Sequence, residues 1–192
     1  MSPPPLPPTP VLETERLILR PVRMADAPAI QRRFAQWDVV RWLHATVPWP
    51  YPDDGAEEHL RRCLDEEAKG AKSHWAITLK GAQDDCLGLI DLWPYDGETR
   101  DNRGFWLDPE YWGRGLMTEA AERVTEYAFE TLGWTELYLN NAEGNAGSHR
   151  IKEKQGAVIV DRSPHAYVGG EAMRVTWRLT REAWRARRQG SS

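Results

Sequence analysis

The stretch Phe105-Trp106-Leu107-Asp108-Pro109-Glu110-Tyr111-Trp112-Gly113-Arg114-Gly115-Leu116-Met117-Thr118-Glu119-Ala120 decides how this chain folds. Its apolar start predicts a strand, which Asp108-Pro109 ends, and the two glycines then precede the longest helical pattern of the chain, in which apolar residues recur every four positions from Leu116 to Ala128. The first turn of a helix presents unpaired N–H groups and a partial positive charge, and glycine lets a ligand approach the backbone. The stretch therefore predicts a strand–turn–helix unit suited to a phosphate or pyrophosphate group.

The rest of the chain alternates strand and helix patterns around this unit. Strands are expected at 16–20, 75–79, 86–93, 104–107, 136–140, 157–160 and 173–179, and helices at 26–37, 56–68, 116–132, 145–155 and 181–188. Six of the first ten residues are proline, which predicts an extended, disordered tail over 1–10. Residues 181–192 are basic and predict a terminal helix or tail. The pattern between these two segments indicates one α/β domain with a mixed sheet.

Composition narrows the classes of function. The 192 residues are 41% hydrophobic and 28% charged, with a net charge of -4, so a polyanion-binding surface is not expected. No apolar run approaches the roughly 18 residues of a membrane helix, and the first residues lack the pattern of a signal peptide. The chain has two cysteines, Cys63 and Cys86, which indicate reduced thiols in a cytoplasmic protein and cannot form a metal quartet.

Three nucleotide-binding classes can be compared with the glycine turn. A dinucleotide fingerprint requires a third glycine where Thr118 stands, a Walker A loop requires Gly-Lys-Ser/Thr, and a kinase requires His-Arg-Asp and Asp-Phe-Gly signatures, none of which is present. The turn by itself therefore leaves two readings open, a phosphate cradle and a plain strand-to-helix connection.

The wider context of the turn resembles a known family. The string Gly104–Ala120 resembles the acetyl-CoA signature of the GNAT acetyltransferases, and in particular the RimJ/RimL-type branch that acetylates ribosomal-protein N-termini. Leu12–Arg20 is similar to the opening of that branch, and Asn145–Ser148 with Glu153–Gly156 is similar to its late helix. The resemblance implies a single GNAT-type domain over 11–180, with a mixed, mostly antiparallel central sheet that is splayed in the middle and flanked by helices.

The resemblance also implies a function. Acetyl-CoA would be the co-substrate, and a primary amine, either a protein N-terminus or a small molecule, would attack it directly in a ternary complex. No metal, membrane or nucleic-acid partner is expected, and a homodimer stays open. The residues expected to contact the cofactor are Trp106, Leu107, Trp112, Gly113, Arg114, Gly115, Leu116, Met117, Thr118, Asn140 and Asn145. A non-catalytic acyl-CoA sensor and, from the glycine turn alone, a nucleotide-binding regulator are the competing classes.

The chain departs from the family pattern at positions that bear on catalysis. Glu110 stands where the superfamily loop has Gln or Arg, and Lys152 stands where many members have a tyrosine that protonates the leaving thiolate. The resemblance implies that Ser148 lies near the thioester, although a hydroxyl in the first turn of a helix also serves backbone N–H groups. The sequence leaves open whether Ser148 or Lys152 assists the thiolate.

The general base is less defined. Asp91 is a lone charge in an apolar strand, where burial would make it more basic, unless a partner satisfies it. His165 has a side chain suited to proton transfer and precedes the last strand, where the family closes its acceptor site, but a surface histidine is the alternative. Glu98 and Asp101 are expected to be solvated in a polar loop. Trp37, Trp42 and Trp49 could line the acceptor site or pack in the core.

Overall fold

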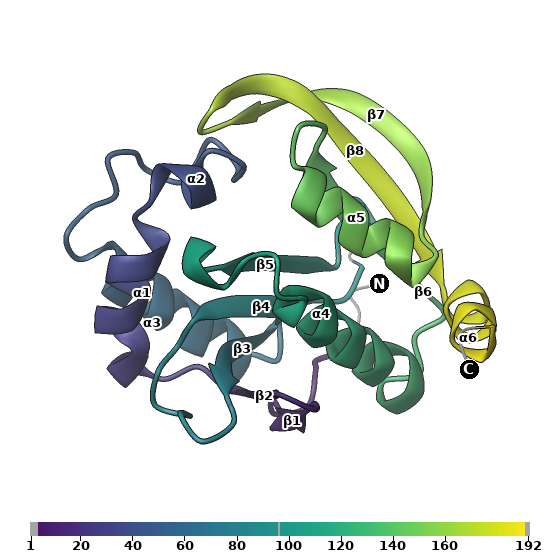
Figure 1. Cartoon of the computed structure of the whole chain (residues 1–192), viewed down its shortest axis with the longest axis horizontal. Coiled ribbons are helices and arrows are strands. Elements are labelled where there is room, and N and C mark those ends of the chain that lie inside the picture. Colours follow the sequence, from purple (N-terminus) through teal and green to yellow (C-terminus); the bar gives the residue numbers. More distant parts are fainter. Residues whose placement is uncertain (1–3, 96, 191–192) are drawn as a thin grey trace.

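The computed structural model describes residues 4–95 and 97–190 and places them in two sheets with flanking helices (Figure 1). The strands are β1 (Leu12–Glu13), β2 (Leu17–Pro21), β3 (Ser73–Leu79), β4 (Gly88–Leu92), β5 (Arg103–Leu107), β6 (Glu136–Ala142), β7 (Val158–Tyr167) and β8 (Gly170–Thr180). The helices are α1 (Ala27–Phe34), α2 (Trp37–Val40), α3 (Gly55–Ala68), α4 (Leu116–Glu126), α5 (Ala146–Gln155) and α6 (Arg181–Gln189), with short turns η1 (Met24–Asp26), η2 (Pro109–Tyr111) and η3 (Tyr127–Thr131).

The central sheet is divided in the middle, as the resemblance implied. Five antiparallel strands follow the order β1-β2-β3-β4-β5, and three more follow the order β6-β8-β7. The two sheets meet where Asn102, just before β5, donates its backbone N–H to the carbonyl of Tyr138 over 2.8 Å and accepts the Tyr138 N–H at its Oδ1 over 2.7 Å. Beyond this point β5 and β6 belong to separate sheets, so each presents an edge toward the other.

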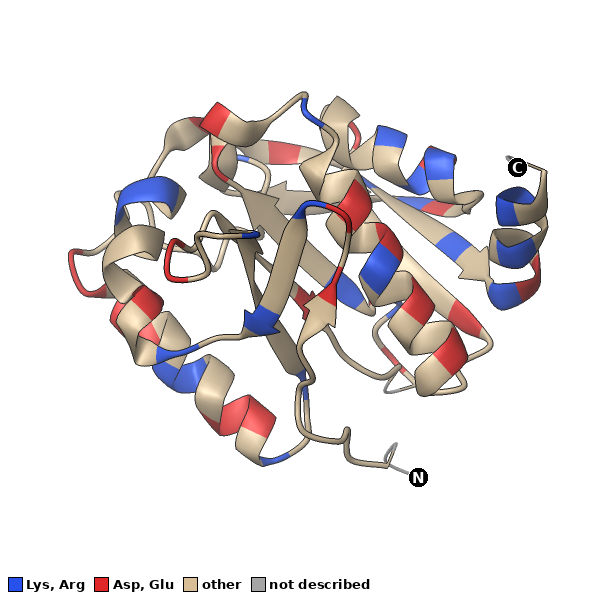
Figure 2. Cartoon of the chain, turned by 60° about the horizontal axis from the view of Figure 1, so that its bottom comes forward, with Lys and Arg blue, Asp and Glu red and all other residues tan. Residues whose placement is uncertain are grey.

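Helices cover both faces of the larger sheet. On one face, α1 and α3 pack against Ala76 and Leu89, and on the other, α4 packs against Trp75 and Ile90. These strand residues alternate in the sequence, so each strand contributes to both cores. The α5 helix lies beside α4 and beneath the long β7–β8 hairpin (Figure 1). Figure 2 shows basic residues gathered on α6, next to the C-terminal end.

Some element boundaries differ from those predicted. The helix expected over 26–37 is divided into α1 and α2, because Gln36 is extended (φ -124°, ψ 133°). The strand expected to end at residue 160 continues to Tyr167 and includes Pro164. A proline is tolerated there because β7 is an edge strand, on which a missing N–H leaves no ladder bond broken.

Residues 4–10 of the proline-rich segment form no helix or strand and are docked on the domain. Leu6 donates its N–H to the carbonyl of Gly70 over 2.7 Å, and the indole of Trp75 donates to the carbonyl of Pro10 over 2.7 Å. The expectation of a disordered tail was therefore wrong for residues 6–10, because a partner indole and carbonyl hold them, while residues 1–3 lie outside the described part. Within residues 4–95 and 97–190, no helix has the length and apolar character needed to cross a membrane.

Candidate active site

The glycine turn leaves the first amides of α4 unpaired. Gly113 and Gly115 have φ angles of +74° and +77°, in the left-handed region where a side chain is strained. Gly115 is the N-cap of α4 and provides no side-chain cap, and the first helical bond runs from the Glu119 N–H to the Gly115 carbonyl over 3.0 Å. By helix geometry, the N–H groups over 116–118 have no partner within the helix. They form a positively polarised end that suits a phosphate.

An ion pair to a distant strand fixes this turn in place. Arg16, just before β2, contacts Glu119 at 2.7 Å, and its Nη1 donates to the carbonyl of Arg114 over 2.9 Å. The Thr14 hydroxyl also hydrogen-bonds to Glu119. The Thr14–Arg16 segment, which carried part of the family resemblance, therefore holds the start of α4 against the sheet.

The predicted cofactor contacts divide into backbone and side-chain groups. Leu116 and Met117 have buried side chains in the core, so only their amides face the turn. Trp106 packs edge-to-face against Phe34 of α1, with ring centroids 5.1 Å apart, on the sheet face opposite α4. The exposed Trp112 donates its indole N–H to the carbonyl of Leu107 over 2.7 Å. Trp112 therefore shapes the far end of β5.

A buried lysine and a serine lie at the start of α5. Asn145 caps the helix, since its Oδ1 accepts the Ser148 N–H over 3.1 Å. Lys152 is only 2% exposed, donates its Nζ to the Ser148 hydroxyl over 2.7 Å, and lies 5.4 Å above the Phe105 ring of β5. Burial, followed by the charge of Arg103, lowers the pKa of Lys152 to about 7, although the charge of Asp101 acts in the opposite direction. A group that titrates near neutral pH and contacts a hydroxyl is suited to move a proton.

Arg103 is a second buried cation that the sequence analysis did not single out. Its Nη1 donates to the Thr125 hydroxyl of α4 over 2.6 Å, and its Nη2 donates to the Gln155 side chain of α5 over 2.9 Å. Burial lowers the pKa of Arg103 to about 10, while the charges of Glu122 and Asp101 raise it. Arg103 thus ties β5 to the two helices that border the splay. The available signal was an Arg directly before the strand expected over 104–107.

Asp101 is not the solvated loop residue that we expected. Its Oδ1 has no solvent contact and no hydrogen-bond partner, and the same is true of the Oδ1 of Asn140 on β6. Burial raises the pKa of Asp101 to about 6, although the Asn140 side chain and the charge of Lys152 act in the opposite direction. The polar composition of the surrounding loop gave no sign that β6 and α5 would enclose this carboxylate.

Asp91 has a charged partner. On the sheet face toward α3, its Oδ1 contacts Nδ1 of His74 at 2.9 Å, and Nε2 of His74 contacts Glu66 at 3.0 Å. Burial alone would lower the pKa of His74, but the hydrogen bond to Asp91 and the neighbouring Cys63 thiol raise it to about 10. His74 is therefore a buried cation at neutral pH, and Asp91 is the carboxylate that compensates it.

His165 lies under the tip of the β7–β8 hairpin. Its ring is 4.7 Å from that of His44 and 4.9 Å from that of Tyr167. Partial burial and the nearby charges of Arg174 and His44 lower the pKa of His165. The hairpin tip is tied to the segment after α2, because the N–H of Ala45 bonds to the carbonyl of Ala166 over 3.1 Å.

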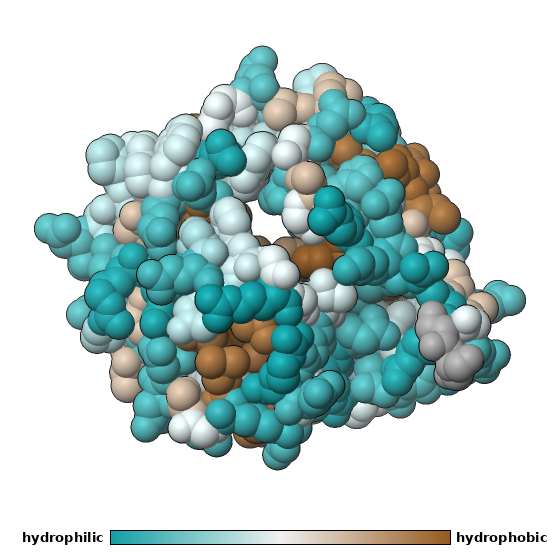
Figure 3. All heavy atoms as spheres, in the orientation of Figure 1, coloured by the Kyte–Doolittle hydropathy of each residue, from teal (hydrophilic) through white to brown (hydrophobic). Residues whose placement is uncertain are grey.

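An opening remains between this rim and the sheet. The space-filling view shows it among α2, β5 and α5, below the hairpin (Figure 3). Of the three tryptophans considered for an acceptor wall, Trp37 and Trp49 are exposed and lie 5.5 Å apart, and Trp42 is half-buried under the guanidinium of Arg41. The catalytic candidates Ser148, Asp91 and His165 come from three different elements, and no hydrogen bond joins any two of them.

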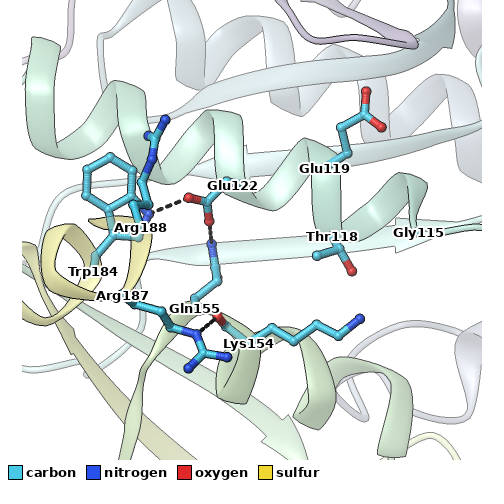
Figure 4. A pocket seen from close by; sticks show the side chains of 9 residues that line it. All are labelled: Gly115, Thr118, Glu119, Glu122, Lys154, Gln155, Trp184, Arg187 and Arg188. Atoms are coloured by element: carbon cyan, nitrogen blue, oxygen red, sulfur yellow. Dashed lines mark hydrogen bonds between the residues drawn. The ribbon is translucent and has the colours of Figure 1, made fainter. Parts of the chain in front are cut away.

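A cavity of about 540 Å³ adjoins the glycine turn on the outer side of α4 and α5 (Figure 4). Its lining residues are Gly115, Thr118, Glu119, Glu122, Lys154, Gln155, Trp184, Arg187 and Arg188. Glu122 is engaged, accepting the Trp184 indole N–H over 2.7 Å and the Gln155 amide over 3.1 Å. The cavity thus runs from the start of α4 to the basic helix α6. Within the described residues, no group of three or more His, Cys, Asp or Glu side chains is arranged to hold a metal ion.

Comparisons with known proteins agree with this geometry. Residues 16–158 match the family model described as an acetyltransferase (GNAT) domain. The uncharacterized N-acetyltransferase YoaA of Bacillus subtilis is 27% identical over 148 residues, covering 77% of this chain and 82% of that protein. Among solved structures, RimJ of Mycobacterium smegmatis in complex with CoA-disulfide has a TM-score of 0.77 at 20% identity, over 91% of this chain and 88% of that chain. The ribosomal-protein-S5-alanine acetyltransferase of Vibrio fischeri has a TM-score of 0.74 at 16% identity, over 91% and 98%.

Proposed function

Because the chain belongs to the GNAT acetyltransferase family, we propose that it transfers the acetyl group of acetyl-CoA to a primary amine by direct attack in a ternary complex. One observation supports this proposal above the others: the start of α4 lies at the end of β5, beside the gap between the two sheets. The unpaired amides at the start of α4 suit a pyrophosphate, and they lie at the end of β5, whose edge faces β6 across the splay. A phosphate-bearing arm can therefore enter between the sheets.

The chain's own groups fit each part of the cofactor. The amides over 113–118 would hold the pyrophosphate, and Arg16 would keep them in position. The edge of β5 lacks a strand partner beyond Asn102, so its backbone groups can pair with the amides of the pantetheine arm. Lys154 and Arg187 line the cavity beside α4 (Figure 4), and we propose that they face the 3′-phosphate of the nucleotide end.

Ser148 and Lys152 are proposed to act on the departing thiolate. The Lys152 ammonium donates to the Ser148 hydroxyl, which can pass its own proton onward. Of the two, Lys152 stands where many family members have a tyrosine. A thiol with a pKa near 8.5 leaves without strong assistance, so a modest contribution to the rate is expected from the pair.

The acceptor is proposed to be a protein N-terminus or a small amine. It would enter through the opening under the hairpin (Figure 3), where Trp37 and Trp49 are exposed. At pH 7 about a tenth of an α-amine with a pKa near 8 is neutral, compared with about four in ten thousand for a lysine side chain. This difference in the neutral fraction favours an α-amine. The names of the structural relatives RimJ and ribosomal-protein-S5-alanine acetyltransferase support a RimJ/RimL-like role.

A non-catalytic acyl-CoA sensor is the second candidate, favoured by the absence of a tyrosine at position 152. The test compares CoA, ATP and NAD as stabilising ligands and then measures thiol release from acetyl-CoA. The amines to be screened are N-terminal peptides, lysine peptides, aminoglycosides and polyamines. Ligand at about 100 times its dissociation constant should add roughly 2.7 kcal/mol of stability. Stabilisation by CoA with no thiol release from any amine would favour the sensor, and equal stabilisation by NAD would refute the CoA site.

A further inference from the structure

Two buried oxygen atoms at the closed end of the splay lack hydrogen-bond donors. They are the Oδ1 atoms of Asp101, which precedes β5, and of Asn140 on β6. The orientation of the Asn140 amide is fixed, since its Nδ2 donates to the carbonyl of Arg100 over 2.7 Å, which leaves Oδ1 as its remaining acceptor. A buried acceptor without a donor costs free energy, and a ligand that brings N–H groups to these two oxygens would remove that cost.

Their place in the fold indicates which ligand. Asp101 is adjacent to Asn102, the residue whose two hydrogen bonds to Tyr138 join the sheets. Lys152 lies close enough for its charge and that of Asp101 to affect each other, and it rests above Phe105 on the β5 edge. The carboxylate and the Ser148–Lys152 pair therefore border the same end of the splay from different elements.

We propose that the Asp101 carboxylate and the Asn140 side-chain carbonyl form the acceptor-amine site, in which Asp101 binds the incoming ammonium group and takes one of its protons. This inference rests on the proposed function. It assigns Asp101 as a catalytic residue because the carboxylate would touch the reacting nitrogen. It also places the Asn140 side chain on the acceptor side, whereas the sequence analysis counted Asn140 among the cofactor contacts.

The surroundings of Asp101 support this role. The charged or titratable groups that face it are Lys152 on α5, Arg103 on β5 and Tyr167 on β7. Burial raises the pKa of Asp101 to about 6, so the group is ionised at neutral pH and still a better proton acceptor than a solvated carboxylate. An ammonium ion supplies the N–H donors that both orphaned oxygens need.

The proton balance closes with the groups present. The ammonium gives one proton to Asp101, and the neutral amine attacks the thioester carbon, so a C–N bond forms and the C–S bond breaks. The thiolate takes a proton through Ser148 from Lys152. The attacking nitrogen loses a second proton, which returns to Lys152 through water. Asp101 then releases the first proton to solvent. The products are the amide, the thiol and one released proton.

Asp91 is less suited to this task than Asp101. The Asp91 carboxylate already contacts the buried cation His74, on the sheet face toward α3. The Asp91 carboxylate therefore already has a charged partner within the fold and does not need an incoming ammonium group to supply one. Asp101 has no ion pair to any described residue within 4 Å, and one of its oxygens has no partner at all.

The test compares Asp101→Asn with Asp161→Asn, a matched change at an exposed carboxylate of β7. The probe is the amine with the fastest thiol release in the acceptor screen. We expect Asp101→Asn to lower kcat/KM by about 100-fold or more, and to remove the limb of its pH profile that rises near pH 6. In the presence of CoA, which cannot react, the affinity for the same amine should fall roughly 10- to 100-fold because a charge-assisted hydrogen bond is lost. Asp161→Asn should leave these quantities unchanged.

A readout without any substrate separates this role from a structural one. The folded pKa of Asp101 lies above its unfolded value, so its contribution to stability is present below about pH 4 and lost as the pH rises through about 6. At pH 7.5 the Asp101→Asn protein should therefore unfold at the same or a higher temperature than the wild type, while its amine affinity falls. An unchanged acidic limb with unchanged amine affinity would overturn the assignment of Asp101. Absence of thiol release from the wild type with every amine would instead overturn the proposed function.

Discussion

Replacing Gly113 by alanine tests the phosphate cradle most directly, because the chain contains a matched control. Gly113 and Gly133 have φ angles of +74° and +73°, both are exposed, and an added Cβ would meet no atom within 4 Å at either position. Gly113 lies in the turn before α4, whereas Gly133 follows the far end of that helical segment. The left-handed conformation costs an alanine about 1–2 kcal/mol, so each variant should lose a similar amount of stability.

The two variants should differ only in ligand affinity. If the Gly113 backbone approaches the pyrophosphate, a methyl group there displaces one amide–phosphate hydrogen bond, which is worth about 1.5–3 kcal/mol when one partner is charged. The dissociation constant for CoA should therefore rise roughly 10- to 150-fold in Gly113→Ala. Gly133→Ala should bind CoA like the wild type. The assay is calorimetric titration with CoA, with thermal unfolding as the measure of stability. Equal CoA affinities in the two variants would refute a cradle at this turn.

Three further outcomes are expected. Ser148→Ala should lower kcat about 10- to 100-fold with little change in acetyl-CoA affinity, whereas a large loss in Lys152→Met with none in Ser148→Ala would assign the proton transfer to the lysine alone. Arg187→Ala should weaken the binding of CoA more than that of 3′-dephospho-CoA, and Arg185→Ala, on the same helix but outside the cavity, should weaken neither. The raised pKa of His74 contributes stability that is fully present below about pH 6.5 and lost as the pH rises through about 10, so the free energy of unfolding should fall across that range in the wild type and change less in His74→Gln.

The conformation of two segments depends on contacts that no local sequence pattern contains. The Ser163-Pro164-His165 stretch lies beyond the strand expected to end at residue 160, yet it continues β7, because β8 pairs with one side and the edge faces solvent. The described part of the proline-rich segment was expected to be mobile, and the Trp75 indole holds it instead. In both cases a partner distant in the sequence supplies the hydrogen bonds that decide the conformation.

The sequence by itself determined the strand–turn–helix unit and the family, since left-handed glycines, a proline stop and a four-residue apolar repeat act on neighbouring residues. Only the tertiary structure decided which charges are buried. Asp101 looks like an ordinary loop residue in the sequence, Lys152 stands out only by its position in the family pattern, and Asp91 looks like a lone carboxylate. Burial and charge pairing depend on β6, α5 and His74, which the fold brings together from separate parts of the chain. The pKa values that make a proton acceptor or donor therefore arise from packing, and the sequence pattern shows only where the backbone can receive a phosphate.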